Sequence, residues 1–202
     1  GVGEIFKPIN QIDKLRVKEK YSRKKDFFVF IGSLHKRKNI KNLLLAFDSY
    51  QKQGGSNNLL IIGKKKWWDK KTESIYQNTT SKHKVIFLGQ LNDKEMSLVL
   101  ASAQALCFIS IFEGFGLPII EAMKCNIPVI TSNTSSMPEI AQDAALIVNP
   151  HKIDEIKNAM IKLDMNEELR NQLIKKGQER VKFFDWDIAA KKLSNILNHE
   201  TI

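Results

Sequence analysis

Residues 104–123 read QALCFISIFEGFGLPIIEAM, and this stretch decides the fold class of the chain. Residues 105–109 are continuously apolar, as in a strand that is buried on both faces of a parallel sheet. Pro118 suits the first turn of a helix. A buried strand that leads through a glycine-containing loop into a helix places that loop at the carboxyl end of the sheet, where open α/β folds bind their ligands.

Similar apolar runs recur on both sides of this stretch and alternate with helical patterns. The predicted strands cover residues 27–32, 59–63, 84–89, 104–110, 127–131 and 145–148. After the first strand, apolar residues from Ile40 to Tyr50 follow the spacing of one helix face, and Asn92 or Asp93 can cap a helix after the third. The alternation predicts an α/β fold: a Rossmann-like, doubly wound parallel sheet of about six strands with helices on both faces.

The domain organisation follows from where this alternation begins and ends. Residues 1–23 are polar and are predicted to be a lead-in or linker from a missing N-terminal domain. Residues 24–184 form the predicted domain, whose length fits one unit at roughly 150 residues per domain. The pattern is wholly helical from residue 151, and residues 185–202 are predicted to form a C-terminal helical tail.

Composition excludes several classes of protein. The chain is 43% hydrophobic, so it is not disordered as a whole, and its apolar runs are too short to span a membrane. Two cysteines without metal-ligand spacing favour a reducing, cytoplasmic compartment, and the four histidines are scattered singly, so no metal site is expected. The net charge of +10 allows nucleic acid, an anionic membrane surface or a phosphate-bearing ligand as partner, and selects none of them.

Two common phosphate-binding motifs are absent from the sequence. A dinucleotide fingerprint starting at Gly114 would need a third glycine where Ile119 stands. The Gly63-Lys64-Lys65 run lacks the upstream glycine and the Ser or Thr of a P-loop. Neither a typical NAD enzyme nor a P-loop NTPase is supported.

The loop before the predicted helix carries the chemistry of a ligand site. Gly114 and Gly116 allow close approach of a ligand to the backbone, and the free N–H groups of the helix start attract phosphate. Glu113 and Glu121 lie at opposite ends of the helix-opening turn, where carboxylates suit sugar hydroxyls. The alternative is that both are ordinary acids favoured by the helix dipole.

Glu113-x7-Glu121, in the form EGFGLPIIEAM, resembles the hallmark of retaining glycosyltransferases of family 4 (glycosyl transferases group 1), in the carboxyl-terminal half of their two-domain GT-B fold. The resemblance covers nearly the whole chain. Further segments resemble other parts of that domain, namely residues 1–8, 31–39 (IGSLHKRKN), 61–67 (IIGKKKW), 87–93 (FLGQLND), 128–139 and 144–150. The Arg-Lys-Asn form of the first loop and the GKKKW segment are similar to mannosyltransferase-like members.

The resemblance implies a role for each matching position. Glu113 would contact the transferred sugar, Lys38 would neutralise the diphosphate leaving group, and Glu121 would bind the ribose hydroxyls. The catalytic candidates are therefore Glu113, Lys38 and Arg37. The donor-binding candidates are Gly32, Ser33, Gln90, Leu91, Gly114, Phe115, Gly116, Leu117, Pro118 and Glu121. Backbone N–H groups in the stretch from Phe115 to Pro118 would hold the distal phosphate and the sugar, and the backbone at Gln90 and Leu91 would cradle the base.

Two basic positions leave alternatives open. Many relatives have arginine where this chain has Ser33, and Arg37 beside Lys38 is the candidate to supply that charge. Alternatively, Lys36-Arg37-Lys38 is a solvated run before a helix. Asp185-Trp186-Asp187 matches a metal-binding DxD only superficially, because an Asp there suits a helix cap.

The resemblance implies a nucleotide-diphospho-sugar donor-binding domain of a retaining, metal-independent hexosyltransferase, with GDP-mannose favoured as the donor. It would act in polysaccharide or glycolipid synthesis without a cofactor and be inactive without its N-terminal domain. The expected partners are a nucleotide sugar, that domain, and a glycan or lipid-linked acceptor, but not nucleic acid. Trp67-Trp68 among lysines leaves open a peripheral contact with the inner membrane face. The alternative functions are a GT-B-fold sugar-nucleotide epimerase or phosphorylase and a non-catalytic, flavodoxin-like binding module.

Overall fold

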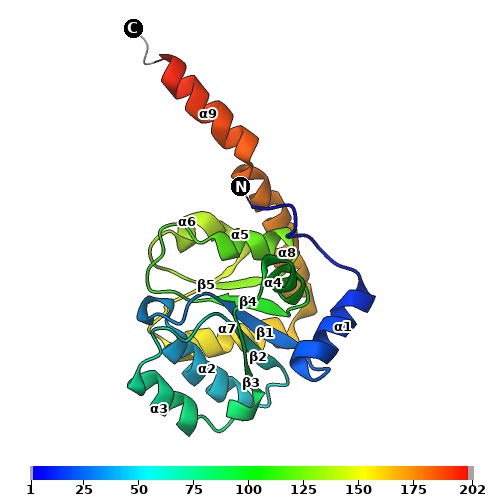
Figure 1. The fold of residues 1–202 in the computed structure, drawn as a ribbon, viewed down its shortest axis with the longest axis vertical. Coiled ribbons are helices and arrows are strands. Elements are labelled where there is room, and N and C mark those ends of the chain that lie inside the picture. The colour runs from blue at the N-terminus through cyan, green and yellow to red at the C-terminus, as the bar shows by residue number, and fades with distance from the viewer. Residues whose placement is uncertain (1, 200–202) are drawn as a thin grey trace.

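The computed structural model describes residues 2–199 and contains one parallel sheet of six strands in the order β3-β2-β1-β4-β5-β6 (Figure 1). The strands are β1 (Phe27–Ile31), β2 (Asn58–Ile62), β3 (Val85–Gly89), β4 (Ala105–Phe108), β5 (Val129–Ser132) and β6 (Leu146–Val148). Every paired strand is parallel to its neighbour. The predicted doubly wound α/β fold is confirmed, with the predicted strand ends shifted by at most two residues.

Helices cover both faces of the sheet (Figure 1). They are α1 (Gln11–Ser22), α2 (Ile40–Lys52), α3 (Lys70–Asn78), α4 (Asp93–Ala101), α5 (Leu117–Lys124), α6 (Met137–Ala141), α7 (Ile153–Met165), α8 (Glu167–Val181) and α9 (Trp186–His199), with short 3-10 turns η1 (Lys36–Lys38), η2 (Lys82–Lys84), η3 (Gln142–Ala144) and η4 (Lys182–Phe184). Helices α2, α3 and α7 pack on one face, and α1, α4, α5 and α6 pack on the other. Helix α8 contacts both α5 and α7.

The central strands explain why the sequence shows continuous apolar runs. All five residues of β1 are buried: Phe28 and Phe30 enter the core beneath α2, while Phe27 and Val29 enter the core beneath α4 and α5. Successive side chains of a strand point to opposite faces, so a strand between two helical layers must be apolar at every position. The outermost strand β6 is covered less, and Ile147 is 40% exposed.

The predicted lead-in contains a helix, α1, which the sequence analysis did not predict. Asn10 caps this helix by accepting a hydrogen bond from the backbone N–H of Asp13. Few apolar side chains of α1 are buried, Val17 among them, so the segment lacks the broad apolar face by which helices are recognised. Tyr21 donates a hydrogen bond to Glu95 and thereby ties α1 to α4. The division of the chain at residues 23 and 184 stays a prediction.

The predicted C-terminal tail is helical over α9, which extends away from the sheet beyond α8 (Figure 1). Its described large apolar side chains, including Trp186 and Leu193, are more than half exposed. The last three residues of the predicted tail lie outside the described residues. Within residues 2–199, no helix combines the length and the apolar character that crossing a bilayer requires.

The ends of β1 and β2 meet in direct backbone contact. Gly32 follows β1 and Gly63 follows β2, and both have a φ of 146°. A Cβ atom added to Gly63 would lie 1.9 Å from the carbonyl oxygen of Gly32. Glycine is therefore required at position 63, both for its backbone angle and for the space beside it.

Candidate functional site

The carboxyl ends of the strands bring four loops to one edge of the sheet, where open α/β folds bind their ligands. Turn η1 follows β1, residues 90–92 follow β3, residues 109–116 follow β4, and residues 133–136 follow β5. The N–H of Ile111 donates to the carbonyl oxygen of Arg37, which joins the first and third of these loops. Asn39 adds a second link, because its side chain donates to the carbonyl oxygens of Ile109 and Pro150.

The three predicted catalytic side chains meet at this edge. Glu113 pairs with Lys38 through one carboxylate oxygen and with Arg37 through the other, each at 2.6 Å. Arg37 also donates to the carbonyl oxygen of Phe112, which holds its guanidinium in the loop that carries Glu113. Arg37 and Lys38 therefore lie beside Glu113, and Lys38 is buried and not a solvated residue, while the catalytic roles of all three stay a prediction.

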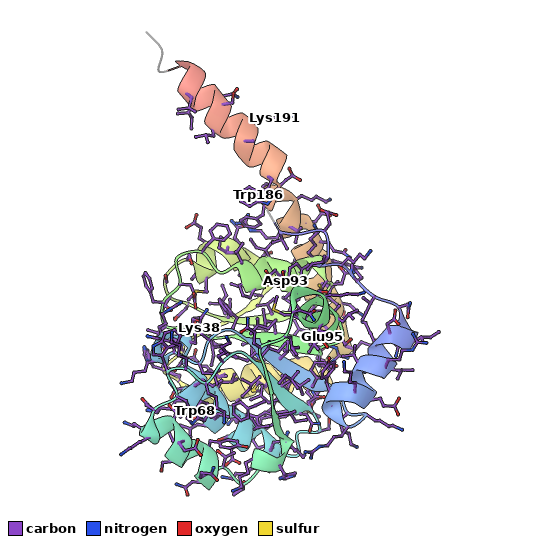
Figure 2. All side chains as sticks on the ribbon, viewed as in Figure 1. Lys38, Trp68, Asp93, Glu95, Trp186 and Lys191 are labelled. Carbon is purple, nitrogen blue, oxygen red and sulfur yellow. The ribbon has the colours of Figure 1, made fainter. Side chains whose placement is uncertain are left out.

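Figure 2 shows where Lys38 lies on the fold, and contacts with its neighbours hold it in place. Its side chain is 9% exposed, and its ammonium lies 4.8 Å from the ring centroid of Phe108. Its Cε atom would lie 3.2 Å from a Cβ atom at Gly32, so the glycine after β1 leaves room for the lysine. Burial against an aromatic face and a carboxylate fixes this positive charge at the end of β1 and β4.

Glu113 is buried and charged. Burial alone would raise the pKa of this carboxyl group, but hydrogen bonds and charge from Lys38 and Arg37 outweigh it and hold the pKa below its ordinary value. The site therefore contains one carboxylate and two cations before any ligand binds. The side chain of Arg37 is 43% exposed, so it is more accessible to a ligand than that of Lys38.

The start of α5 supplies backbone donors beside this cluster. Gly116 precedes the helix with a φ of 103°, and no side chain caps the helix end. The N–H groups at a helix start have no partner inside the helix, and the helix dipole makes them attractive to anions. Pro118 has no N–H, so the donors in the predicted stretch come from Phe115, Gly116 and Leu117.

Glu121 lies one turn into α5 and is half-buried. Burial, with a smaller contribution from the nearby charge of Asp93, raises the pKa of its carboxyl group to about 7. Among the side chains that the structure describes, no lysine, arginine or histidine lies within ion-pair distance of Glu121. The structure thus separates the two glutamates of the motif: Glu113 is paired with cations and Glu121 is not.

The remaining predicted residues spread along the same edge. Ser33 follows Gly32 at the end of β1, and Gln90 and Leu91 follow β3. Gln90 is exposed, and Leu91 packs partly against the core under α4. Strands β3 and β4 are separated by β2 and β1, which at about 4.8 Å per spacing places Gln90 roughly 14 Å from the Glu113 loop. A ligand that touches both must be extended.

A hydroxyl clamp holds the loop that carries Glu113, and the sequence analysis missed it. Ser135 donates to the carbonyl oxygen of Glu113 at 2.6 Å and accepts from its N–H at 3.3 Å. Ser136 donates to the carbonyl oxygens of Glu113 and Phe115. Ser135 has a left-handed backbone, with a φ of 55°, which is uncommon for a residue other than glycine. The signal in the sequence is the Thr134-Ser135-Ser136 run directly after a strand of the same sheet edge.

Within residues 2–199, no three His, Cys, Asp or Glu side chains gather as metal ligands would. Cys107 and Cys125 are buried, and burial raises the pKa of both thiols. Metal independence stays a prediction.

The sequence profile described as Glycosyl transferases group 1 matches residues 11–180. The chain belongs to this family. The O-antigen chain mannosyltransferase B of Escherichia coli is 30% identical over 182 residues, which is 89% of this chain and 48% of the relative. The chain thus spans about half the length of this curated relative. The MMP alpha-(1->4)-mannosyltransferase of Mycolicibacterium hassiacum is 36% identical over 105 residues, 50% of this chain and 25% of that protein.

Solved structures share the fold of this group 1 chain. The C-terminal domain of a group 1 family protein (LpcC) from Francisella tularensis superposes with a TM-score of 0.77 at 22% identity, covering 91% of this chain and 97% of that domain. The Alr3699/HepE protein of Anabaena, solved with UDP and glucose, gives a TM-score of 0.87 at 17% identity, covering 98% of this chain and 55% of that one. The predicted resemblance to group 1 glycosyltransferases, and to half of a two-domain fold, is confirmed.

Proposed function

We propose that this chain is the donor-binding domain of a retaining, metal-independent hexosyltransferase that uses a nucleotide-diphospho-sugar in polysaccharide or glycolipid synthesis. The observation that carries the proposal is the Glu113 carboxylate, held at 2.6 Å from both Lys38 and Arg37 beside the uncapped start of α5. This arrangement places cations for a diphosphate and an acceptor for sugar hydroxyls within one short stretch of the sheet edge.

The two cations fit the chemistry of the leaving group. When the bond between the sugar and the nucleoside diphosphate breaks, negative charge develops on the diphosphate. Lys38, Arg37 and the N–H groups at the start of α5 are already positioned to stabilise it, and one such donor is typically worth about 3–4 kcal/mol. Glu113 would bind the transferred sugar while it keeps both cations in place. No cofactor is part of this proposal.

The second glutamate and the β3 loop fit the other end of the donor. Glu121 has no cationic partner among the described residues, so its oxygens are open to accept hydrogen bonds from ribose hydroxyls. The backbone at Gln90 and Leu91, roughly 14 Å from the Glu113 loop across three strand spacings, would then receive the base. An extended nucleotide sugar accounts for all of these positions together.

The relatives favour a particular donor. Three of the proteins similar to this chain are named mannosyltransferases of O-antigen or serotype-specific chains. We extend the proposal to GDP-mannose as donor and to a glycan or lipid-linked acceptor. Because this chain spans about half of its first relative, the acceptor side would come from an N-terminal domain. The proposed location is cytoplasmic, with peripheral contact at the inner membrane face.

Calorimetric titration of the 202-residue chain with GDP-, UDP- and ADP-sugars tests the proposal. We expect GDP-mannose to bind, and Lys38→Ala and Arg37→Ala each to weaken binding by about tenfold or more, because each removes a charged phosphate partner. Lys36→Ala is the matched control, since this lysine belongs to the same turn but pairs with Asp69. A chain that binds no nucleotide sugar, or that loses the same affinity in all three variants, would refute the proposal.

A further inference from the structure

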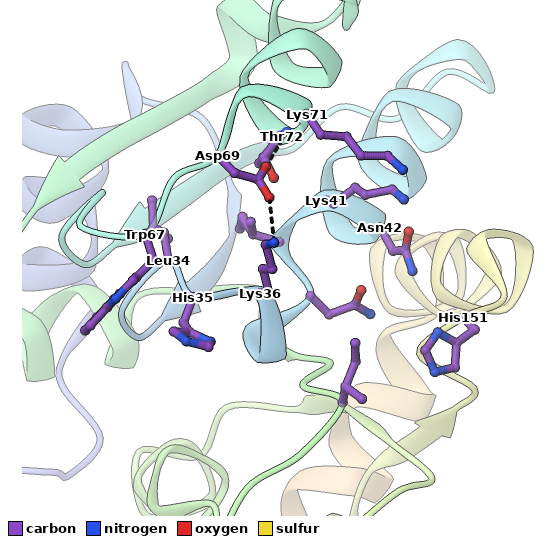
Figure 3. A pocket seen from close by; sticks show the side chains of 13 residues that line it. Leu34, His35, Lys36, Lys41, Asn42, Trp67, Asp69, Lys71, Thr72 and His151 are labelled. Carbon is purple, nitrogen blue, oxygen red and sulfur yellow. Dashed lines mark hydrogen bonds and ion pairs between the residues drawn. The ribbon is translucent and has the colours of Figure 1, made fainter.

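A cavity lies beside turn η1, lined in part by His35 and Lys36 (Figure 3). Its volume is about 310 Å³, and it lies between η1, the start of α2, the loop before α3 and the segment after β6. Consecutive residues of η1 point to different places: Arg37 and Lys38 contact Glu113, whereas Lys36 pairs with Asp69 on the wall of the cavity. The cavity is therefore separate from the proposed donor site.

Basic side chains dominate the lining of this cavity. Lysines at positions 36, 41 and 71 and histidines at positions 35 and 151 line it, against the single carboxylate of Asp69. That carboxylate is already engaged, because it caps α3 by accepting from the N–H of Thr72 at 2.8 Å and lies 3.7 Å from the ammonium of Lys36.

Lys41 and Lys71 come from two different helices and line the same space (Figure 3). Within the described part of the chain, no carboxylate lies within ion-pair distance of either ammonium. Like charges that share a cavity disfavour each other, and an anion between them removes that cost. Lysine is also a common point-charge ligand for phosphate.

The backbone at the cavity also favours a phosphate ligand. Asn39 precedes α2 in a left-handed conformation, and its side chain makes no cap hydrogen bond. Its amide group instead donates to the carbonyl oxygens of Ile109 and Pro150, which fixes the cavity wall to β4 and the segment after β6. The start of this 13-residue helix is thus left without a side-chain acceptor next to the two lysines.

An exposed indole lies at the rim. Trp67 is 46% exposed and meets the ring of His35 edge-on at 5.3 Å between centroids. Trp68 differs, because it is half-buried among Tyr76 and Phe87. An amphipathic ring beside a cationic recess suits a phosphate group whose other substituent is apolar or lies at an interface.

We propose that this cavity is a phosphate-binding site, distinct from the nucleotide-sugar site, that takes the phosphate group of a lipid head group or of a free phosphate compound. The phosphate lies between Lys41 and Lys71, with Lys36 and the start of α2 beside it. This site does not depend on the proposed donor, so its test can fail while the donor proposal stands.

The first experiment follows the backbone N–H and indole N–H signals of the 202-residue chain by NMR during titration with inorganic phosphate. We expect saturable shifts at Ile40, Lys41 and the Trp67 indole. Lys41→Ala/Lys71→Ala should weaken this phosphate affinity by about tenfold or more, because it removes two charged partners. Lys25→Ala/Lys175→Ala is the matched control: it removes the same charge from exposed positions and should change the affinity by less than about twofold.

The second experiment identifies the source of the phosphate. Vesicles of phosphatidylglycerol in phosphatidylcholine, or of phosphatidylcholine alone, are sedimented with the wild-type chain and both double variants. Retention on the anionic vesicles that only the Lys41/Lys71 variant loses supports a lipid head group, and phosphate binding without vesicle retention supports a soluble compound. The proposal is overturned if phosphate causes no saturable shift at the cavity, or if both double variants weaken binding equally.

Discussion

Glu113 and Glu121 share one sequence motif and one helix start, yet the structure gives them opposite environments. Glu113 is buried between two cations, which hold its pKa below the ordinary value. Glu121 is half-buried near Asp93, and its pKa rises to about 7. The comparison shows that the charge state of a carboxylate follows from its neighbours and not from its place in a motif. The charge of Glu113 is thus paired before a ligand binds, whereas Glu121 has no cationic partner among the described residues.

The largest expected effect comes from neutralising the paired glutamate. Glu113→Gln leaves Lys38 buried without its counter-charge, and breaking a buried pair in this way typically costs about 3–5 kcal/mol. We expect the free energy of unfolding, measured in urea at pH 7, to fall by about 3 kcal/mol. Glu179→Gln, which breaks the exposed pair with Lys182, is the control and should change stability by less than about 0.5 kcal/mol. Equal losses of unfolding free energy in both variants would mean that the ion pairs of Glu113 stabilise the fold no more than an exposed pair does.

Neutralising the unpaired Glu121 should raise the free energy of unfolding, whereas neutralising Glu113 should lower it. The folded pKa of Glu121, about 7, lies above its ordinary 4.5, so its stabilising contribution is complete below pH 4.5 and is lost as the pH rises through 7. Glu121→Gln should therefore raise the free energy of unfolding by about 1–2 kcal/mol at pH 8, and by much less at pH 5. Urea unfolding of both proteins at the two pH values measures this difference. A gain that is the same at both pH values would show that the charge of Glu121 is not involved.

A smaller effect is expected from the clamp beneath Glu113. Ser135→Ala removes the hydrogen bonds to both backbone groups of Glu113 and should cost about 1 kcal/mol of stability. Because the loop then loses its position, nucleotide-sugar affinity measured by calorimetry should fall by about threefold to tenfold. Ser97→Ala removes a hydroxyl that bonds within α4 and serves as the control. If affinity is unchanged while stability falls, Ser135 supports the fold without positioning Glu113.

The sheet could be predicted from the sequence because its central strands are apolar at every position. The runs containing Phe28 and Leu60 are typical of strands that are buried on both faces, and both side chains are fully buried. Helix α1 could not be predicted in this way, since its exposed Ile12 and Leu15 give it no single apolar face. Its position depends on tertiary contacts such as that between Tyr21 and Glu95.

The candidate site could be predicted where its residues lie in loops that directly follow predicted strands. The loop with Glu113 precedes α5, and Lys38 follows β1, so parallel topology brings them together. The clamp of Ser135 was not predictable, because hydroxyl groups carry no periodic signal and their partners lie 22 residues away. The different partners of the three basic residues of η1 were not predictable either, since nothing in the sequence separates Lys36, which pairs with Asp69, from Arg37 and Lys38, which pair with Glu113.

The backbone contact between Gly32 and Gly63 limits how this domain could be re-engineered. A Cβ atom at position 63 would lie 1.9 Å from a carbonyl oxygen. The distance between the loops that follow β1 and β2 is therefore set by the backbone alone. Libraries that aim to admit bulkier or differently shaped molecules can vary Ser33 or Gln90, whose side chains end at the surface. Substitution at these glycines cannot move the two loops apart. A wider binding site therefore has to come from changes in the other loops at this edge of the sheet.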